Sequence, residues 1–197
     1  MPESPPLCVD LDGTLVCTDT MTKSLLLLLK ANPLYIFLLP FWLRRGRAYF
    51  KRQLSSRVKI DPATLPYCPA VLDLLRREHE KGRMLILATG TDEIIAQDIA
   101  RHLGIFDNVL ASNGEINLTS HRKLEALQEL LGPGEFDYAG NSRKDLAVWR
   151  KCRLAYVVNA PSWVISELEQ ANIPHEVLQT GKPGLWERLL RLIKVHN

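Results

Sequence analysis

Short apolar runs alternate with amphipathic runs along most of this chain, and no other feature of the sequence restricts the fold as strongly. The apolar runs have the length of buried strands, whereas the amphipathic runs repeat their apolar residues at the helical period over about 10–14 residues. Strands that alternate with such helices need right-handed crossovers, so they form a parallel sheet with helices on both faces. The sequence thus predicts an α/β fold. The expected strands are residues 6–10, 83–89, 107–112, 136–140, 154–159 and 174–179, and the expected helices are residues 69–82, 92–104, 122–132, 142–152 and 183–194.

The composition is that of an ordinary globular protein. The chain has 197 residues, of which 46% are hydrophobic and 24% are charged, enough for one sizeable core and a small insertion. The cysteines Cys8, Cys17, Cys68 and Cys152 are scattered without a C-x-x-C pair, and the chain does not open on a secretory signal. We therefore expect neither a disulfide framework nor a zinc site, and a reducing, cytoplasmic location.

Charge is distributed unevenly along the chain. Between Thr20 and Ile60 there is no Asp or Glu, but there are nine Lys or Arg residues. The formal net charge of the whole chain is +3, so the remainder carries −6, which is 3 minus 9. Such a contrast indicates an insertion that differs in character from the rest of the chain. We expect a core formed by residues 1–18 and 68–197 and an inserted segment formed by residues 19–67.

The inserted segment is apolar as well as basic. Its stretch SLLLLLKANPLYIFLLPFWLRRGR is interrupted by Lys30, Asn32, Pro33 and Pro40, which favours two or three short helices over a membrane span. Its leucines either pack the segment against itself and the core, or form, with the basic residues that follow, a surface that lies on an anionic membrane. No recognition motif accompanies the basic charge, so nucleic acid is not an expected partner.

Polar residues follow three of the predicted strands at the point where each strand ends, and one lysine opens a predicted helix. In a parallel α/β sheet, ligands gather outside the carboxyl ends of the strands, where the strand order reverses. We therefore expect these side chains to converge at one edge of the sheet. The candidate site residues are Asp10, Asp12, Thr89, Gly90, Lys123, Asn141 and Asp145.

The two aspartates of VDLDGTLV are only two positions apart. Carboxylates held that close repel each other and raise each other's pKa unless a cation lies between them. A hard divalent cation such as Mg²⁺ takes oxygen ligands, keeps several waters and bridges carboxylates to phosphate. The sequence therefore predicts a magnesium site formed by Asp10, Asp12, Asn141 and Asp145.

The same residues suit phosphoryl transfer. Asp10 could attack phosphorus and form an aspartyl phosphate, which divides hydrolysis into two easier steps. Asp12 could protonate the leaving oxygen and later deprotonate the attacking water. Thr89 and the amides that follow it, starting at Gly90, could hold phosphate oxygens, and Lys123 could offset their charge.

Four stretches carry a family resemblance: DLDGT at residues 10–14, Thr89 after an apolar run, Lys123 at a helix start, and GNSRKD at residues 140–145. In that order they resemble the four motifs of the haloacid dehalogenase (HAD)-like phosphatase superfamily, over residues 5–18 and 68–160. The resemblance implies a Rossmann-like sheet, Mg²⁺, Asp10 as nucleophile, and a helical cap domain at the insertion.

A narrower resemblance covers the whole chain. It is similar to the HAD-like hydrolase domain that is found fused to UbiA-type prenyltransferases. With the basic and apolar insertion, this similarity implies a small-molecule or lipid-linked phosphate substrate, a peripheral membrane contact through the cap, or a prenyltransferase partner.

One position departs from the superfamily pattern, because Asn141 stands where the superfamily usually has an acid. An amide oxygen can bind magnesium but brings no charge, so metal affinity should fall. Two functions follow: a magnesium-dependent phosphatase, or a binding module that has lost turnover and serves a membrane prenyltransferase. Purely structural interpretations also stand, with Thr89 beginning a helix, Lys123 on a solvated helix face, and Asp145 as a surface residue in a first helical turn.

Overall fold

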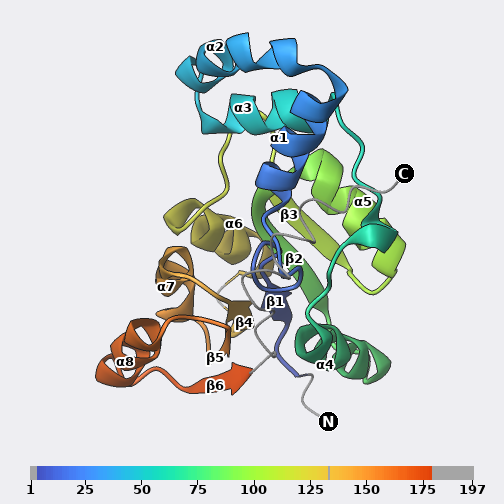
Figure 1. Cartoon of the computed structure of the whole chain (residues 1–197). Helices are drawn as coiled ribbons and strands as arrows, with labels where there is room; N and C mark the ends of the chain where they lie inside the picture. Colours follow the sequence, from blue (N-terminus) through green and yellow to red (C-terminus); the bar gives the residue numbers. More distant parts are fainter. Residues whose placement is uncertain (1–3, 133, 179–197) are drawn as a thin grey trace.

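The computed structural model describes residues 4–132 and 134–178. Six strands form one sheet in the order β3-β2-β1-β4-β5-β6, and every neighbouring pair is parallel (Figure 1). All six strands lie where the sequence predicts them, and the α/β fold class is confirmed. The strands are β1 (Leu7–Val9), β2 (Leu85–Asp92), β3 (Asn108–Ser112), β4 (Asp137–Gly140), β5 (Leu154–Val158) and β6 (His175–Leu178).

Each strand of the sheet sends alternate side chains to opposite faces. Leu7 and Val9 of β1 join the apolar cluster on one face, whereas Cys8 between them joins the cluster on the other. This alternation arises because successive side chains of a strand point to opposite sides. Both faces are therefore apolar and need helices to cover them.

Helices on the two sides of the sheet bury these faces. On one side lie α4 (Pro69–Glu80) and α5 (Glu93–Leu103), and on the other lie α6 (His121–Leu131), α7 (Leu146–Trp149) and α8 (Ser162–Gln170) (Figure 1). The sequence predicts one helix over residues 142–152, but a 3-10 turn, Arg143–Asp145, precedes a helix of only four residues. Helix α8 was not predicted, although the crossover from β5 to β6 requires a helix there. The helix predicted at residues 183–194 lies outside the described residues.

The inserted segment forms a helical cap over the carboxyl ends of β1 and β2 (Figure 1). It contains α1 (Thr20–Ala31), a 3-10 helix η1 (Pro33–Phe37), α2 (Leu39–Arg44) and α3 (Arg47–Ser55). Leu28, Trp42, Phe50 and Leu54 form a small apolar core of its own. After α3 the chain returns to α4 by way of the 3-10 turn η2 (Pro62–Thr64), and Ile60 packs into the cluster on the sheet.

A disulfide joins the two chain segments that connect the cap to the core. Cys17 and Cys68 are paired, with their Cα atoms 5.7 Å apart and a sequence separation of 51. Backbone hydrogen bonds run beside it, from the Cys17 amide to the Pro66 carbonyl and from the Cys68 amide to the Leu15 carbonyl. The expectation of no disulfide is wrong, because the fold brings together two cysteines whose spacing shows no local pattern.

None of the helices within residues 4–132 and 134–178 is both long and apolar enough to cross a membrane. The apolar stretch of the insertion is divided at Asn32, which ends α1 and caps η1. The predicted interruption by polar residues and prolines is therefore confirmed.

A buried ion-pair network lies at the end of the sheet that is opposite the cap, where β4 begins. Asp137, the first residue of β4, is fully buried and accepts hydrogen bonds from Arg83 and from both Nε (2.9 Å) and Nη2 (2.6 Å) of Arg153. Arg83 also donates to the Glu78 carboxylate (2.9 Å) and to the Pro5 carbonyl (2.6 Å). The network thus links α4, β4 and the segment before β1.

Removal of the buried carboxylate charge should destabilise the protein strongly. Asp137→Asn leaves Arg83 and Arg153 without their shared anion, and we expect the free energy of unfolding to fall by about 3 kcal/mol. The matched control is Glu167→Gln, which removes the exposed pair with Arg150 and should cost less than about 1 kcal/mol. Urea unfolding followed by circular dichroism measures both, and equal effects would contradict a structural role for Asp137.

Counting free thiols tests directly whether the disulfide is formed. Titration of the denatured, unreduced protein should detect two free thiols, from Cys8 and Cys152, and four after reduction. The double variant Cys17→Ser/Cys68→Ser should lose about 2–4 kcal/mol of unfolding free energy, because the crosslink restricts the unfolded chain. Four thiols before reduction would show that the pair is not formed.

Candidate active site

The candidate residues lie at the switch point of the sheet. β1 pairs with β2 on one side and with β4 on the other, and the connections that follow β2 and β4 lead to opposite faces. A crevice therefore opens outside the carboxyl end of β1, where ligands bind in sheets of this kind. Asp10 is the first residue after β1 and lies in this crevice.

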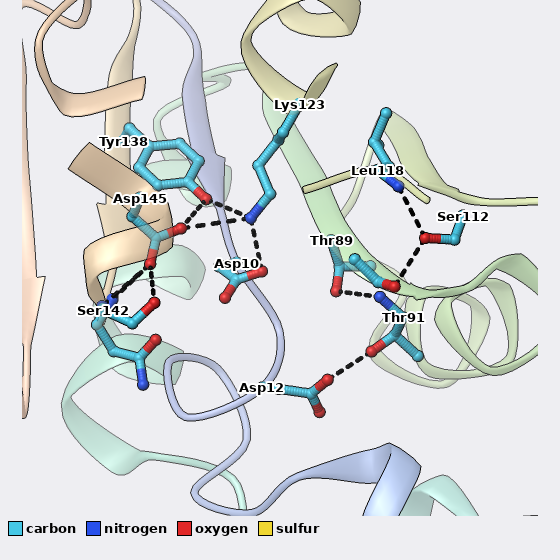
Figure 2. A network of polar contacts seen from close by, with 12 residues as sticks. Asp10, Asp12, Thr89, Thr91, Ser112, Leu118, Lys123, Tyr138, Ser142 and Asp145 are labelled. Atoms are coloured by element: carbon cyan, nitrogen blue, oxygen red, sulfur yellow. Dashed lines mark hydrogen bonds and ion pairs between the residues drawn. The ribbon is translucent and has the colours of Figure 1, made fainter. Parts of the chain in front are cut away.

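Lys123 is the centre of a buried polar network (Figure 2). Its ammonium donates to Asp10 Oδ1 at 2.9 Å and to the Tyr138 hydroxyl at 2.7 Å, and it lies 3.4 Å from Asp145 Oδ1. The Tyr138 hydroxyl in turn donates to Asp145 Oδ1 at 2.8 Å. Lys123 is 3% exposed and Asp145 is 1% exposed, so neither is a solvated surface residue. The first turn of α6, the end of β1 and the loop after β4 are thereby connected.

Asp145 is oriented by its own loop. Its Oδ2 accepts hydrogen bonds from the backbone amide of Ser142 (3.1 Å), from the Ser142 hydroxyl (3.1 Å) and from the backbone amide of Asn141 (3.2 Å). Gly140 permits this close approach, because a Cβ at that position would lie 2.8 Å from Asp145 Cγ. The loop GNSRKD therefore holds the Asp145 carboxylate with its other oxygen directed to Tyr138 and Lys123.

Asp12 is held by hydrogen bonds from the cap and from β2, and Figure 2 shows the one from Thr91 of β2. Its Oδ1 accepts from the Thr20 amide at 2.8 Å, at the first residue of α1, and its Oδ2 accepts from the Thr91 hydroxyl at 2.6 Å. Thr89 is buried, and its hydroxyl accepts from the Thr91 amide at 3.0 Å. Both threonines belong to β2, which extends to Asp92, so Thr89 does not begin a helix.

Burial shifts the titration of these groups. Burial raises the pKa of Asp10 to about 6; the Lys123 ammonium lowers it, and the Asp145 and Asp12 carboxylates add to the rise. Burial also raises the pKa of Asp12, against the opposing effect of the Thr91 hydrogen bond. Burial alone would lower the pKa of Lys123, but the Asp10 and Asp145 carboxylates outweigh it and raise that pKa. Both shifts favour the protonated form of the group, which is the ammonium of Lys123 and the carboxylic acid of Asp12.

A cavity of about 720 Å³ joins the sheet edge to the cap. The predicted residues Asp10, Asp12, Thr89, Gly90, Lys123, Asn141 and Asp145 all line it. The cap supplies basic and apolar groups to the same wall, among them Arg47, Lys51, Leu43 and Phe50.

Cap residues also contact the core directly. Lys51 donates to the Gly90 carbonyl and to Asn117 Oδ1 (2.7 Å), and Arg52 pairs with Asp92 (2.9 Å) and Glu93 (2.6 Å). These contacts hold α3 over the carboxyl end of β2. The cap is thus a wall of the site rather than a separate body.

The donor set fits a magnesium ion. The carboxylates of Asp10, Asp12 and Asp145 line the cavity together with the buried Lys123, and every polar side chain that could bind a metal here offers oxygen. Within the described part of the chain, no three His, Cys, Asp or Glu side chains lie close enough to form a metal site by themselves. An ion would depend on Asp10, the Asn141 amide oxygen and water. The direct ligand roles of Asp12 and Asp145 stay predictions, since their oxygens accept the hydrogen bonds described above.

Comparison with known proteins settles the family. A family model described as haloacid dehalogenase-like hydrolase matches residues 7–150, which include every candidate site residue. This chain belongs to that family. HAD-like phosphatases generally use Mg²⁺.

Relatives of this HAD-like chain are known by sequence and by structure. It is 36% identical over 193 residues to the uncharacterized protein y4nM of Sinorhizobium fredii, covering 98% of this chain but only 37% of that protein. A Bordetella pertussis protein of unknown function matches with a TM-score of 0.67 at 15% identity, covering 90% of this chain and 99% of that one. Phosphoserine phosphatase in its apo form matches with a TM-score of 0.61 at 14% identity, covering 90% of this chain and 95% of that one. These two structures share the fold.

Three residues that contribute to the site were given no role from the sequence. Thr91 holds Asp12, Tyr138 links Lys123 to Asp145, and Ser142 holds Asp145. Thr91 lies two residues after Thr89, a spacing that could have indicated it. Tyr138 gave no signal, because a tyrosine in a buried strand is normally part of the apolar core.

Thr91 should act as a positioning residue. Thr91→Val removes the hydroxyl that donates to Asp12 while keeping the shape of the side chain, and we expect kcat for an aryl phosphate to fall at least about tenfold. That hydrogen bond lowers the pKa of Asp12, so its loss raises this pKa and moves the alkaline limb of the pH–rate profile to higher pH. Thr91→Ser keeps the hydroxyl and should restore both. A fall in kcat without movement of that limb would argue against an effect through Asp12.

Proposed function

We propose that this protein is a magnesium-dependent phosphomonoesterase that works through an aspartyl phosphate on Asp10. The observation that carries the proposal is the position of Asp10, at the end of β1, in contact with the buried Lys123 and at the floor of the cavity. A nucleophilic carboxylate needs a neighbouring cation that offsets the charge of the arriving phosphate, and Lys123 meets that need.

We assign the other residues the following roles, which their contacts support. Asp10 attacks phosphorus as a carboxylate, and the bond from phosphorus to the leaving oxygen breaks as Asp12 gives that oxygen its proton. Asp12 then takes a proton from water, which attacks phosphorus and releases Asp10 and inorganic phosphate. The Thr20 amide and the Thr91 hydroxyl hold Asp12 in one orientation during both steps. Thr89 and the Gly90 region line the part of the cavity where phosphate oxygens would be bound.

Magnesium would be held by Asp10 and Asn141, and Asp145 is the further predicted ligand. When bound, the ion would neutralise part of the repulsion between the Asp10 carboxylate and the phosphate dianion. Asn141 contributes an oxygen but no charge, so we expect weaker metal binding than an aspartate would give.

The cavity wall suggests the substrate class. Arg47, Lys51 and Lys144 line it with positive charge, whereas Met21, Phe50 and Leu54 line it with apolar surface. A phosphate monoester that carries an apolar group, such as a lipid-linked phosphate, would complement both. A small polar phosphate ester would use only the basic half.

A second candidate function is a binding module without turnover that serves a membrane prenyltransferase. The uncharged Asn141 favours it, as do the hydrogen bonds that occupy both oxygens of Asp145. The relative y4nM is much longer than this chain, which leaves room for a further domain in that protein. The two candidates differ in whether phosphate esters are turned over.

Hydrolysis of a panel of phosphate monoesters tests the proposal. The parent protein should be active with Mg²⁺ and inactive with a chelator, and Asp10→Asn should lose at least about 10³-fold in kcat because no nucleophile remains. Asn141→Asp should lower the Mg²⁺ concentration needed for half-maximal activity about tenfold, since it adds a charged oxygen ligand.

Each outcome selects one of the candidates. Activity of the parent that Asp10→Asn abolishes supports the phosphatase. Activity of Asn141→Asp alone, with the parent inert, supports a binding module that Asn141 has silenced. Asp10→Asn protein with full activity would contradict the role of Asp10 outright, provided that its thermal melting matches the parent.

A further inference from the structure

The cap carries a cluster of exposed apolar side chains on η1 and α2, which lie on the side of the cap away from the sheet (Figure 1). Phe37, Phe41 and Leu34 are 69%, 67% and 66% exposed. Contiguous apolar surface of this kind marks an interaction site in soluble domains. We call this cluster the apolar tip, and it consists of Leu34, Ile36, Phe37, Leu38, Phe41 and Leu43.

The apolar tip is not needed for packing within the cap. Tyr35 and Leu39 of the same two helices point inward and pack against the small cap core around Trp42, whereas the tip residues between them remain exposed. The cap core is therefore complete without the tip. An exposed apolar cluster of this kind indicates a surface that binds a partner.

The charge around the tip identifies the chemistry of that partner. The segment from Thr20 to Ile60 contains nine basic residues and no acidic one. Arg44 and Arg47, directly after the tip, are exposed and form no ion pair among the described residues. A second copy of the same surface would bring two such basic segments together and be repelled, whereas an anionic surface would be attracted.

We propose that the apolar tip and the basic residues behind it dock the protein onto the surface of an anionic phospholipid bilayer. The phenylalanine and leucine side chains enter the boundary between headgroups and acyl chains, and the arginines contact lipid phosphates. No helix crosses the bilayer in this arrangement, in agreement with the short helices of the cap.

The tip and the cavity share one residue. Leu43 belongs to the tip and also lines the cavity, and Arg47 lies beside it in the same lining. The docking itself does not depend on turnover, so it stands or falls separately from the proposed phosphatase activity.

Cosedimentation with vesicles tests the proposal. The full chain should bind vesicles that contain phosphatidylglycerol at least about tenfold more tightly than vesicles of phosphatidylcholine alone, and high salt should weaken the binding. Phe37→Ser/Phe41→Ser should lower the partition onto anionic vesicles at least about tenfold, because both side chains are removed from the lipid boundary. Arg44→Glu/Arg45→Glu should do the same through charge.

Matched controls separate the tip from general surface effects. Trp163→Ser removes an exposed aromatic side chain, 47% exposed, from α8, and Arg101→Glu reverses an exposed charge on α5; both should bind vesicles like the parent. Thermal melting establishes that each variant is folded, and neither Phe37 nor Phe41 lines the cavity.

Three results would overturn the proposal. The first is a folded parent that does not bind anionic vesicles. The second is a phenylalanine double variant that binds them like the parent. The third is a concentration-dependent dimer that the same double variant abolishes, without vesicle binding, which would assign the tip to self-association.

Discussion

The site depends on one buried cation and the carboxylates around it. Lys123 reaches from α6 to Asp10 at the end of β1 and to Asp145 after β4, so the contacts of one ammonium join three separate parts of the chain. Burial of the Lys123 ammonium costs desolvation energy, which its pairing with two carboxylates offsets. The cost of burying those carboxylates is offset in turn by the ammonium and by the hydrogen bonds from Tyr138 and Ser142. The carboxylate of Asp12 is not part of this ion-pair cluster and accepts hydrogen bonds from Thr20 and Thr91. The resulting excess of negative charge is what a divalent cation would neutralise.

The cap contributes to the site as much as the sheet does. Thr20, the first residue of α1, binds Asp12, while Lys51 and Arg52 of α3 reach the end of β2. The Cys17–Cys68 disulfide joins the two connecting segments immediately beneath, so entry and exit of the cap are tied at one point. The same cap exposes apolar side chains, together with arginines that form no ion pair within residues 4–132 and 134–178. One small element thus forms the wall of the cavity, holds the acid–base candidate, and carries the surface that we propose meets lipid.

The places where sequence reasoning failed share a physical cause. The disulfide joins cysteines separated by 51 residues, and only the return of the chain after the cap brings them together. Tyr138 lies in a strand whose neighbours are all buried, so nothing local distinguishes its hydroxyl from the core around it. The structural interpretations of Lys123 and Asp145 were excluded by burial, which depends on the packing of α6 and α7 against the sheet. Each of these facts concerns contacts between residues far apart in sequence.

The order of residues predicts the alternation of strands and helices, the parallel sheet that follows from it, the polar residues at the strand ends, and the basic, apolar insertion. These depend on periodicity and composition, which are local properties of the chain. Folding in three dimensions is needed for Lys123 to bridge Asp10 and Asp145, for Thr91 to bind Asp12 and for Cys17 to pair with Cys68, and it sets which side chains of the cap remain exposed. Those outcomes depend on the order of strands at the switch point and on how the cap folds over it, and both are set by contacts between distant residues.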